Sequence, residues 1–187
     1  MSELAEQIGL LRPIQDQELE LMLSWRNEPS IRQHMYTTHE ISKEEHLSWW
    51  KRVKGSERQR YFMYEYAGAS LGIVGFTGID QANQNSSWAF YASPRAPKGT
   101  GSRMELLALN YAFDQLGLHK LCCEVLASNN PVIKLHEKFG FKIEGLLRDQ
   151  YKRDEKFIDI YRLGLLYDEW AEKRNEMIGK LMRSFKG

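Results

Sequence analysis

The chain has 187 residues, of which 42% are hydrophobic and 27% are charged, and its formal net charge is +1. This length and composition are typical of one globular domain. With 26 Lys and Arg against 25 Asp and Glu, the chain lacks the strong basic field that sequence-independent nucleic-acid binding requires. No apolar run approaches the roughly 20 residues of a membrane-spanning helix. We therefore expect neither a nucleic-acid partner nor a membrane partner.

The two cysteines, Cys122 and Cys123, are adjacent, so they cannot form an ordinary disulfide with each other. Free thiols and an N-terminus without the pattern of a secretory signal indicate the cytoplasm. Their place in an apolar run favours packing within a strand over a role as nucleophile. We expect no metal site, because the following histidines have no ligand spacing with cysteines or carboxylates: His34, His39, His46 and His119.

The first part of the chain predicts one strand and two main helices. Asp16 stands at an N-cap position ahead of apolar residues at helical spacing. Ser42 and Glu45 form a capping-box pattern that opens another helix. The expected elements are a strand over 8–14, a helix over 16–28, a short element from Ser30 and a helix over 42–55.

Three strands are expected next, over 61–66, 71–79 and 88–92, joined by a tight turn at Ala67-Gly68-Ala69 and a polar loop over 80–85. Glycine recurs at every third position of the second strand, where it is normally unfavourable. A bulge, a close approach by substrate and packing against a bulky neighbour all explain such glycines, and we favour packing. The glycines are Gly72, Gly75 and Gly78.

The second half of the chain predicts helices alternating with strands. Apolar residues at helical spacing run to Gly117, and Pro131 suits the first turn of a later helix that ends at Gly140. The chain as a whole predicts a single mixed α/β domain over 1–187. The expected elements are a helix over 104–116, a strand over 121–126, a helix over 130–138, strands over 141–145 and 157–166, and an amphipathic C-terminal helix over about 168–185.

A glycine-containing turn, Gly99-Thr100-Gly101-Ser102, lies between an expected strand and an expected helix. Backbone amides at such a turn form a cradle for an anion, and glycine lets the backbone approach a phosphate closely. The alternative is a flexible loop that leads into a helix. The spacing matches neither a Walker P-loop nor a dinucleotide-binding motif.

Five segments in this order resemble the GNAT superfamily of N-acetyltransferases over nearly the whole chain. The resemblance implies a mixed, mostly antiparallel sheet of about seven strands, splayed between strands 4 and 5 and flanked by helices. It also implies acetyl transfer from acetyl-CoA to an amine. The segments are Trp88-Ala89-Phe90-Tyr91, Lys98-Gly99-Thr100-Gly101-Ser102, Glu124-Val125-Leu126-Ala127-Ser128-Asn129, Leu135-His136-Glu137-Lys138-Phe139-Gly140-Phe141 and Glu144-Gly145.

The resemblance also implies the coenzyme-binding residues. The turn would bind the coenzyme A pyrophosphate through backbone amides, and the strand edge would pair with the pantetheine arm. The family often has Gln or Arg at the position of Ala96, and Lys98 is placed to compensate for its absence. The expected coenzyme-binding residues are Phe90, Tyr91, Ala92, Lys98, Gly99, Thr100, Gly101, Ser102 and Asn129.

Two residues are candidates for the proton transfers. His136 stands where many family members have the tyrosine that protonates the departing thiolate, and an imidazolium is a competent acid near neutral pH. The alternative is a histidine that packs at the helix surface. Glu124, a carboxylate within an apolar strand, is a candidate base or substrate anchor. Its alternatives are a structural carboxylate paired with a nearby lysine and a carboxylate that points to solvent.

The acceptor region resembles the acetyltransferases of the pseudaminic acid pathway, which acetylate the 4-amino group of a UDP-linked 4-amino-4,6-dideoxy sugar for flagellin glycosylation. Guanidinium groups would hold diphosphate oxygens by charge-assisted hydrogen bonds, aromatic and methionine side chains would sandwich the uracil, and an imidazole would bond to the diphosphate or sugar. For some of these residues the alternative is helix packing. The candidates are Arg26, Arg32, Met35, Tyr36, His46 and Trp49.

Other acceptors and another class of function remain as alternatives. Relatives that acetylate protein N-termini or polyamines share the second-half motifs, but a polyamine site needs several acidic side chains. The acceptor region is instead basic, with Arg26, Arg32, His34 and His46, which favours an anionic acceptor. Ala96 and His136 also suit a catalytically silent acyl-CoA-binding module. The sequence is compatible with a homodimer.

Overall fold

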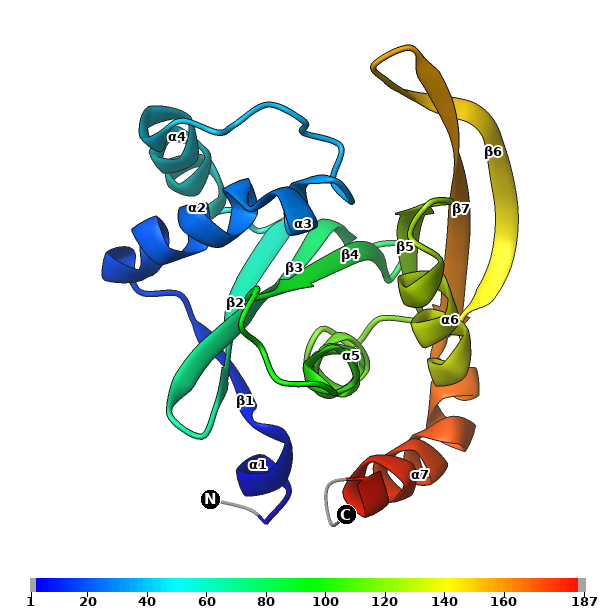
Figure 1. The fold of residues 1–187 in the computed structure, drawn as a ribbon. Coiled ribbons are helices and arrows are strands. Elements are labelled where there is room, and N and C mark those ends of the chain that lie inside the picture. The colour runs from blue at the N-terminus through cyan, green and yellow to red at the C-terminus, as the bar shows by residue number, and fades with distance from the viewer. Residues whose placement is uncertain (1–2, 185–187) are drawn as a thin grey trace.

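The computed structural model describes residues 3–184, which form a mixed α/β fold around one seven-stranded sheet (Figure 1). The strand order is β1-β2-β3-β4-β5-β7-β6. Every neighbouring pair is antiparallel except β4 and β5, which are parallel. The expected fold is therefore confirmed. The strands are β1 (Leu10–Pro13), β2 (Gln59–Tyr66), β3 (Ala69–Asp80), β4 (Asn85–Ala92), β5 (Lys120–Leu126), β6 (Lys142–Arg153) and β7 (Lys156–Leu166).

Helices cover both faces of the sheet. Residues from α5, α6 and α7 pack together on one face, and α2 and α4 pack on the other face, over β2 and β3. Among the described residues, no helix is long and apolar enough to cross a bilayer. The helices are α1 (Glu3–Ile8), α2 (Leu19–Asn27), α3 (Pro29–Arg32), α4 (Lys43–Val53), α5 (Thr100–Asn110), α6 (Asn130–Phe139) and α7 (Tyr167–Ser184), with a 3₁₀ turn at Asp16–Glu18 and a π-helical turn at Tyr111–Gln115.

Two hydrophobic cores lie on opposite faces of the sheet, and successive strand residues alternate between them. In β2, Met63 belongs to the core under α2 and α4, whereas Tyr64 belongs to the core under α5 and α7. In β3, Ile73 and Val74 divide in the same way. All four side chains are 3% exposed or less. Both faces of β2 and β3 are therefore buried, which holds β4 in a fixed position beside them.

The sheet opens between β4 and β5. The two strands pair only through Asn85–Ser87 and Lys120–Cys122, at the start of each strand. Beyond this point Trp88–Ala92 pair with β3 alone, and the remainder of β5 pairs with β7 alone. Figure 1 shows the two strands diverging. The expected splay is present, and it opens toward the carboxyl ends of both strands.

The hairpin of β6 and β7 is longer than the sequence predicts. The expected strand ends at 145, but β6 continues to Arg153, and the hairpin projects beyond the rest of the sheet (Figure 1). Its outer part was missed because the residues of this edge strand are mostly polar and exposed, so they lack apolar alternation. A register shift between Leu147 and Tyr151 and a positive φ of 51° at Asp149 further interrupt the strand pattern.

Two expectations near the N-terminus are wrong. Ile8 ends α1 instead of beginning a strand, and β1 starts at Leu10. Asp16 is not an N-cap, because the cap of the 3₁₀ turn is Gln15. The Asp16 carboxylate instead accepts hydrogen bonds from Trp50 Nε1 at 3.0 Å and from Lys54 Nζ at 2.7 Å. It therefore ties the start of the chain to α4.

Other expected boundaries agree closely with the structure. The C-terminal helix was expected over about 168–185, and α7 spans Tyr167–Ser184. Phe185, at the end of that expected range, lies outside the described residues. Gly140 ends α6 in the left-handed conformation, with φ of 106°, which is the usual C-terminal role of glycine.

The cap of α4 provides a test of the local sequence reasoning. Ser42 Oγ accepts a hydrogen bond from the Glu45 amide at 3.1 Å, as the capping-box pattern predicts. We expect Ser42→Ala to lower the free energy of unfolding by about 1 kcal/mol, measured by urea denaturation. Ser48→Ala, on the exposed side of the same helix, is the matched control and should cause no loss. Equal effects of the two variants would show that the cap contributes nothing.

Candidate functional site

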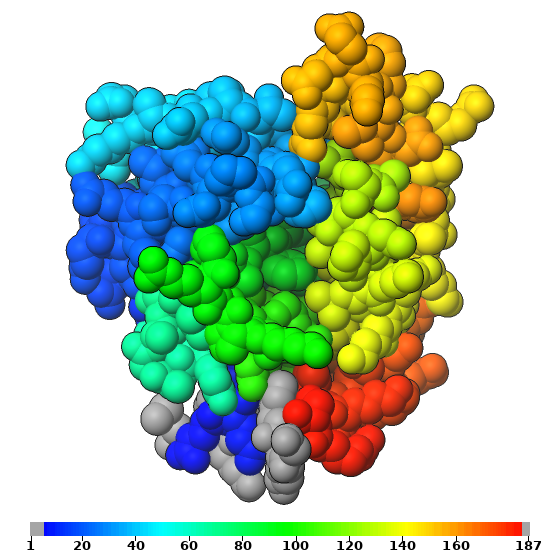
Figure 2. Space-filling model, in the orientation of Figure 1, coloured from blue at the N-terminus to red at the C-terminus, as the bar shows by residue number. Residues whose placement is uncertain are grey.

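A cavity of about 150 Å³ lies where β4 and β5 separate. We call it the gap cavity. Figure 2 shows the surface hollowed between the light-blue segment after α3, the green segment leading into α5 and yellow-green α6. The gap cavity brings together six residues that the sequence predicts to bind or react, and seven others. Its lining is His34, Met35, Tyr36, Trp88, Ala89, Phe90, Cys123, Glu124, Val125, Leu126, Asn129, Val132 and His136.

The edge of β4 that faces the gap offers its backbone to an extended ligand. Trp88–Ala92 bond to β3 on one side, whereas pairing with β5 stops at Ser87. An extended chain with amide groups adds to such an edge as another strand would. Phe90, Tyr91 and Ala92 lie on this segment, so the geometry fits a linear ligand with amides.

The N-terminus of α5 lies beside the gap and has the geometry of an anion site. Gly99 has φ of 91°, a conformation that favours glycine. The amides of Thr100 and Arg103 donate to the carbonyls of Pro97 and Gly99. Because the first four amides of a helix lack intrahelical partners, those of Gly101 and Ser102 remain available for phosphate oxygens.

Space and charge at the same turn suit a diphosphate. A Cβ at Gly101 would lie 3.4 Å from Leu135 and 3.6 Å from Phe90, so glycine keeps the backbone close to the gap. Lys98 and Arg95 are exposed on the preceding loop, and both add positive charge beside the free amides. The residues present therefore fit a group that carries a diphosphate and an extended amide arm.

His136 is buried at the wall of the gap cavity and is paired with a carboxylate. Its Nδ1 lies 2.8 Å from Glu105 Oε1, and the two side chains are 4% and 0% exposed. Burial raises the pKa of Glu105, and the nearby His136 opposes that rise. The expectation of a histidine at the helix surface is thus wrong. The expectation of an acid stays a prediction that the position permits.

Glu124, on β5, also lines the gap cavity and has two polar neighbours. Its Oε2 accepts a hydrogen bond from the Tyr36 hydroxyl at 2.8 Å, and its Oε1 lies 4.0 Å from Arg162 Nη1. Burial is the larger cause that raises the pKa of the Tyr36 hydroxyl, and its hydrogen bond to the Glu124 carboxylate is the second cause. The hydroxyl therefore keeps its proton and remains a hydrogen-bond donor. Among the described residues, the partners of Glu124 are therefore a tyrosine and, at a longer distance, an arginine, and not the lysine of one alternative. Its side chain is 36% exposed, so it also meets solvent, as the other alternative supposed.

A second cavity, of about 400 Å³, lies on the face of the sheet covered by α2 and α4. We call it the helix cavity. Aromatic rings form much of its wall. The Trp49 ring stacks on the His46 ring with 5.3 Å between ring centroids, and it meets the Tyr61 ring edge-on with 5.0 Å between centroids. Its lining is Arg26, Thr37, Ile41, Glu45, His46, Trp49, Arg52, Tyr61, Ile73 and Tyr91.

Polar atoms without partners point to a ligand for the helix cavity. Among the described residues, nothing bonds to the buried Nη1 of Arg26 or the buried Nε2 of His46. Burial lowers the pKa of Arg26, and the positive charge of Arg32 lowers it further. Burial likewise lowers the pKa of His46. A half-buried guanidinium without a carboxylate favours the binding of an anion.

The structure separates the expected acceptor residues into three places. Arg26, His46 and Trp49 line the helix cavity, with Tyr91, which was expected to bind coenzyme. Met35 and Tyr36 line the gap cavity instead. Arg32 lies outside both, in a shallow surface pocket beside Arg153. Three residues that the sequence reasoning missed are Glu105, Arg52 and Tyr61.

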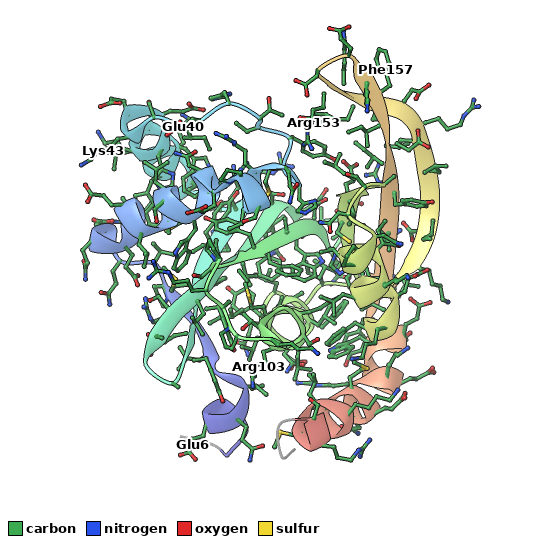
Figure 3. The ribbon with its side chains drawn as sticks, in the orientation of Figure 1. Glu6, Glu40, Lys43, Arg103, Arg153 and Phe157 are labelled. Carbon is green, nitrogen blue, oxygen red and sulfur yellow. The ribbon has the colours of Figure 1, made fainter. Side chains whose placement is uncertain are left out.

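One loop, residues 33–42, connects the two cavities. Its first residues, among them Tyr36, line the gap cavity, and Thr37 and Ile41 line the helix cavity. The β6–β7 hairpin holds this loop, because the Tyr151 hydroxyl donates to the Tyr36 carbonyl at 2.6 Å and Arg153 Nη2 donates to the Met35 carbonyl at 2.8 Å. In Figure 3 Arg153 lies between the hairpin and this loop.

Within the described part of the chain, no three His, Cys, Asp or Glu side chains are placed together as metal ligands. The cysteines are free, with Cys123 buried and Cys122 half-buried. Burial raises the pKa of both thiols. This favours the expected packing role for Cys123, because the thiolate is the nucleophilic form.

Comparison with known proteins identifies a family and several relatives. The model of the Acetyltransferase (GNAT) domain matches residues 10–142. Acetyltransferase PseH of Campylobacter jejuni is 30% identical over 74% of this chain and 85% of its own length. Spermidine N(1)-acetyltransferase of Escherichia coli is 23% identical over 86% of this chain and 87% of its own length.

A solved structure has the same fold. The spermidine N-acetyltransferase of Vibrio cholerae, in complex with CoA and spermine, superposes with a TM-score of 0.81. The match covers 86% of this chain and 96% of that one at 23% identity. At this identity the likeness concerns the fold, so the acceptor has to be argued from the cavities.

The glycines of β3 provide a test of how the helix cavity is built. A Cβ at Gly75 would lie 2.5 Å from the Tyr61 ring, and one at Gly72 would lie 2.6 Å from Met104. Packing against a bulky neighbour is therefore confirmed for these two, whereas Gly78 has φ of 61° at an irregularity in the ladder.

We expect Gly75→Ala to displace Tyr61, because a ring cannot remain 2.5 Å from a methyl group. Overpacking of this kind costs about 1–3 kcal/mol. Urea denaturation would measure the loss, and tryptophan fluorescence would report the change beside Trp49. Gly55→Ala, where a Cβ would meet nothing within 4 Å, is the control. A Gly75→Ala protein with unchanged stability and fluorescence would contradict this account of the cavity wall.

Proposed function

Because the chain belongs to the GNAT acetyltransferase family, we propose that it acetylates an amine on an anionic nucleotide sugar. The acceptor proposed is the 4-amino group of a UDP-linked 4-amino-4,6-dideoxy sugar, as in pseudaminic acid biosynthesis for flagellin modification. As a GNAT acetyltransferase the chain is an enzyme of a family that uses acetyl-CoA. Its relation to Acetyltransferase PseH supports the sugar route.

The observation that carries the proposal is the guanidinium of Arg26. It lines the helix cavity, its Nη1 is buried, and within the described residues that atom has no hydrogen-bond partner. Burying a charge without a partner is costly, and a diphosphate supplies the missing negative charge and two acceptor oxygens. Arg52, which lines the same cavity, adds a second cation for the diphosphate.

The walls of the helix cavity suit a nucleotide. Trp49 and Tyr61 present aromatic surface against which a uracil ring can stack, and His46 has a free Nε2 for a sugar or phosphate oxygen. The volume of about 400 Å³ lies within the range of small-molecule sites. Met35 and Tyr36 stand at the gap cavity, so we assign them to the sugar end of the acceptor. We assign Arg32, in its surface pocket, no direct contact.

The coenzyme occupies the opposite side of β4 in this proposal. The amides of Gly101 and Ser102 hold the diphosphate of acetyl-CoA, with Lys98 beside them, and the pantetheine arm pairs with Phe90–Ala92. Asn129, which lines the gap cavity, meets the arm from the other side. Tyr91 faces the helix cavity, so only its backbone contributes to the coenzyme site. The thioester then lies between β4 and β5.

The chemistry requires an amine held beside the thioester carbonyl and a way to move one proton. Binding both substrates across β4 supplies the proximity, which accounts for much of the acceleration in such reactions. Glu124 accepts the proton of the amine, directly or through water. His136 gives a proton to the departing thiolate. Both residues line the gap cavity.

A polyamine acceptor is the principal alternative, and relatives that acetylate spermidine support it. A polyamine carries several positive charges and requires carboxylates. The helix cavity has one, Glu45, which bonds to His39 at 3.0 Å, and it has two arginines. This balance favours the anionic acceptor. Acetylation of protein N-termini is a second alternative for the acceptor, and a catalytically silent acyl-CoA-binding module is the alternative to an enzyme. The homodimer is a separate proposal about assembly. The experiment below tests all three.

The deciding experiment follows free thiol while acetyl-CoA is incubated with each acceptor in turn. We expect release with the UDP-linked amino sugar, because Arg26 holds its diphosphate, and little release with the same amino sugar lacking the nucleotide. Thiol release with spermidine or peptides alone would replace the proposal with one of the alternatives. Tight binding of the coenzyme without turnover on any amine would indicate the silent module. Sedimentation of the same preparation tests the homodimer.

Arg26→Met tests the anion contact, because it removes the charge and replaces only the unbranched apolar part of the side chain. A charge-assisted hydrogen bond contributes about 1.5–3 kcal/mol, so the KM for the sugar nucleotide should rise about tenfold to a hundredfold. The KM for acetyl-CoA should stay unchanged. Arg183→Ala, exposed on α7, is the control. Equal rises in both KM values would mean that Arg26 acts through folding alone.

A further inference from the structure

Glu105 is a fully buried carboxylate in α5, a helix whose buried side chains are mostly apolar. Its neighbours Met104, Leu106, Ala108 and Leu109 are all 0% exposed, as Glu105 is. One of its oxygens bonds to His136, and the other is buried and has no partner within the described residues. A carboxylate in such a place costs free energy unless it is paired.

Stability does not explain this residue. A buried charged pair is often neutral or worse for stability than well-packed apolar side chains of similar volume. Burial also raises the pKa of Glu105, which is the direction expected when the ionised form is disfavoured. Buried, perturbed carboxylates of this kind occur preferentially at functional sites. Within residues 3–184, the hydrogen bond of Glu105 runs to the histidine that lines the gap cavity.

We propose that Glu105 is a positioning residue for acetyl transfer, which holds His136 with the proton on Nδ1 and leaves Nε2 for the departing sulfur. This rests on the proposed role of His136 as acid. A carboxylate on one ring nitrogen fixes which tautomer the imidazole adopts and where its other nitrogen points. Because Nδ1 is 2.8 Å from Glu105 Oε1, Nε2 is the nitrogen left for the gap cavity.

The rings around His136 hold it in the same orientation. Its ring centroid lies 5.4 Å from Trp88, 5.2 Å from Phe141 and 6.1 Å from Phe90, and the Trp88 and Phe90 rings meet it edge-on. These contacts come from β4 and from the start of the segment after α6. Together with Glu105 they fix the imidazole on several sides, so rotation away from the cavity requires repacking of the core.

Glu105 also links the acid to the coenzyme turn. Glu105 lies in the second turn of α5, the helix that begins at the glycine turn Gly99–Ser102. His136 lies in the second turn of α6, the helix that Asn129 precedes. Both helices begin at the open end of the gap. The contact between the two side chains therefore fixes the acid relative to the amides proposed to bind the diphosphate.

The proton balance of the step is simple. The bond from the amine nitrogen to the carbonyl carbon forms, and the bond from that carbon to sulfur breaks. The leaving sulfur takes one proton from His136 Nε2, and the amine loses one proton, which returns through Glu124 and solvent to the imidazole. Glu105 keeps its hydrogen bond to Nδ1 throughout, so it gains and loses no proton in this balance.

A double-mutant cycle tests whether Glu105 acts through His136. We expect His136→Phe to lower kcat about a hundredfold, within the range of general acids. Glu105→Gln should lower kcat about tenfold or more and leave the KM for acetyl-CoA unchanged. In the His136→Phe background, Glu105→Gln should have no further effect, because its partner is absent. Glu137→Gln, exposed beside His136 on α6, is the control that keeps wild-type kcat.

Additive losses in the cycle would overturn the proposal, since they would show that Glu105 acts independently of His136. Full turnover by a folded His136→Phe protein would overturn both this role and the acid assignment. The acceptor proposal would then still stand on the thiol-release assay with wild-type protein. The failures of the two proposals are therefore distinguishable.

Nitrogen NMR of the imidazole provides a readout in the wild-type protein, with Glu105 unchanged. In ¹⁵N-histidine-labelled wild-type protein, we expect His136 to carry a proton on Nδ1 across the pH range in which the protein is folded. A neutral ring protonated only on Nε2 would overturn the proposal, because Glu105 would then not be accepting a proton from Nδ1. Assignment uses the spectrum of His136→Phe, in which the signal is lost.

Discussion

The partial pairing of β4 and β5 is the constraint on which the rest of the structure depends. Parallel strands need a crossover connection, and α5 lies in the crossover between these two. Because the strands pair at their amino ends and separate at their carboxyl ends, α5 and α6 both begin at the open end of the gap. Free helix amides, an unpaired strand edge and the walls of both cavities therefore converge there.

Strands β4 and β5 form the gap, and a loop from the N-terminal part of the chain lines it. The 33–42 loop lines both cavities, and the β6–β7 hairpin holds that loop through Tyr151 and Arg153. Tyr36 completes the bridge by donating to Glu124 on β5. The position of the candidate base thus depends on three segments that are distant in sequence. A substitution near the tip of the β6–β7 hairpin would therefore shift the 33–42 loop and, through Tyr36, the Glu124 carboxylate.

Local patterns in the sequence predicted what local chemistry determines. The cap at Ser42, the helix end at Gly140 and the glycine turn at 99–102 all lie where expected. The missed features depend on contacts across the fold. Asp16 binds Trp50, 34 positions away, and Glu105 binds His136, 31 positions away. No periodicity encodes such pairs, although a lone Glu among the apolar residues of α5 was a signal for the second. Arg32 lines neither cavity, although the sequence predicted that it binds the acceptor. Its position in a short helix did not reveal the direction in which its side chain points.

The buried Glu105 and the half-buried Arg26, which lie on opposite faces of the sheet, differ in where their charges find partners. Glu105 has its partner within the fold, so its charge is committed to one histidine. Arg26 has a buried nitrogen with no partner among the described residues, so its charge is available to a ligand. In the proposed complex, an anionic acceptor held by Arg26 would bring negative charge to the helix cavity, separate from the Glu105 carboxylate on the other face of the sheet. β4 divides these two environments, with Tyr91 lining one cavity and Phe90 the other. The strand proposed to pair with the coenzyme would therefore also keep the diphosphate of the proposed acceptor away from the proposed proton-transfer pair.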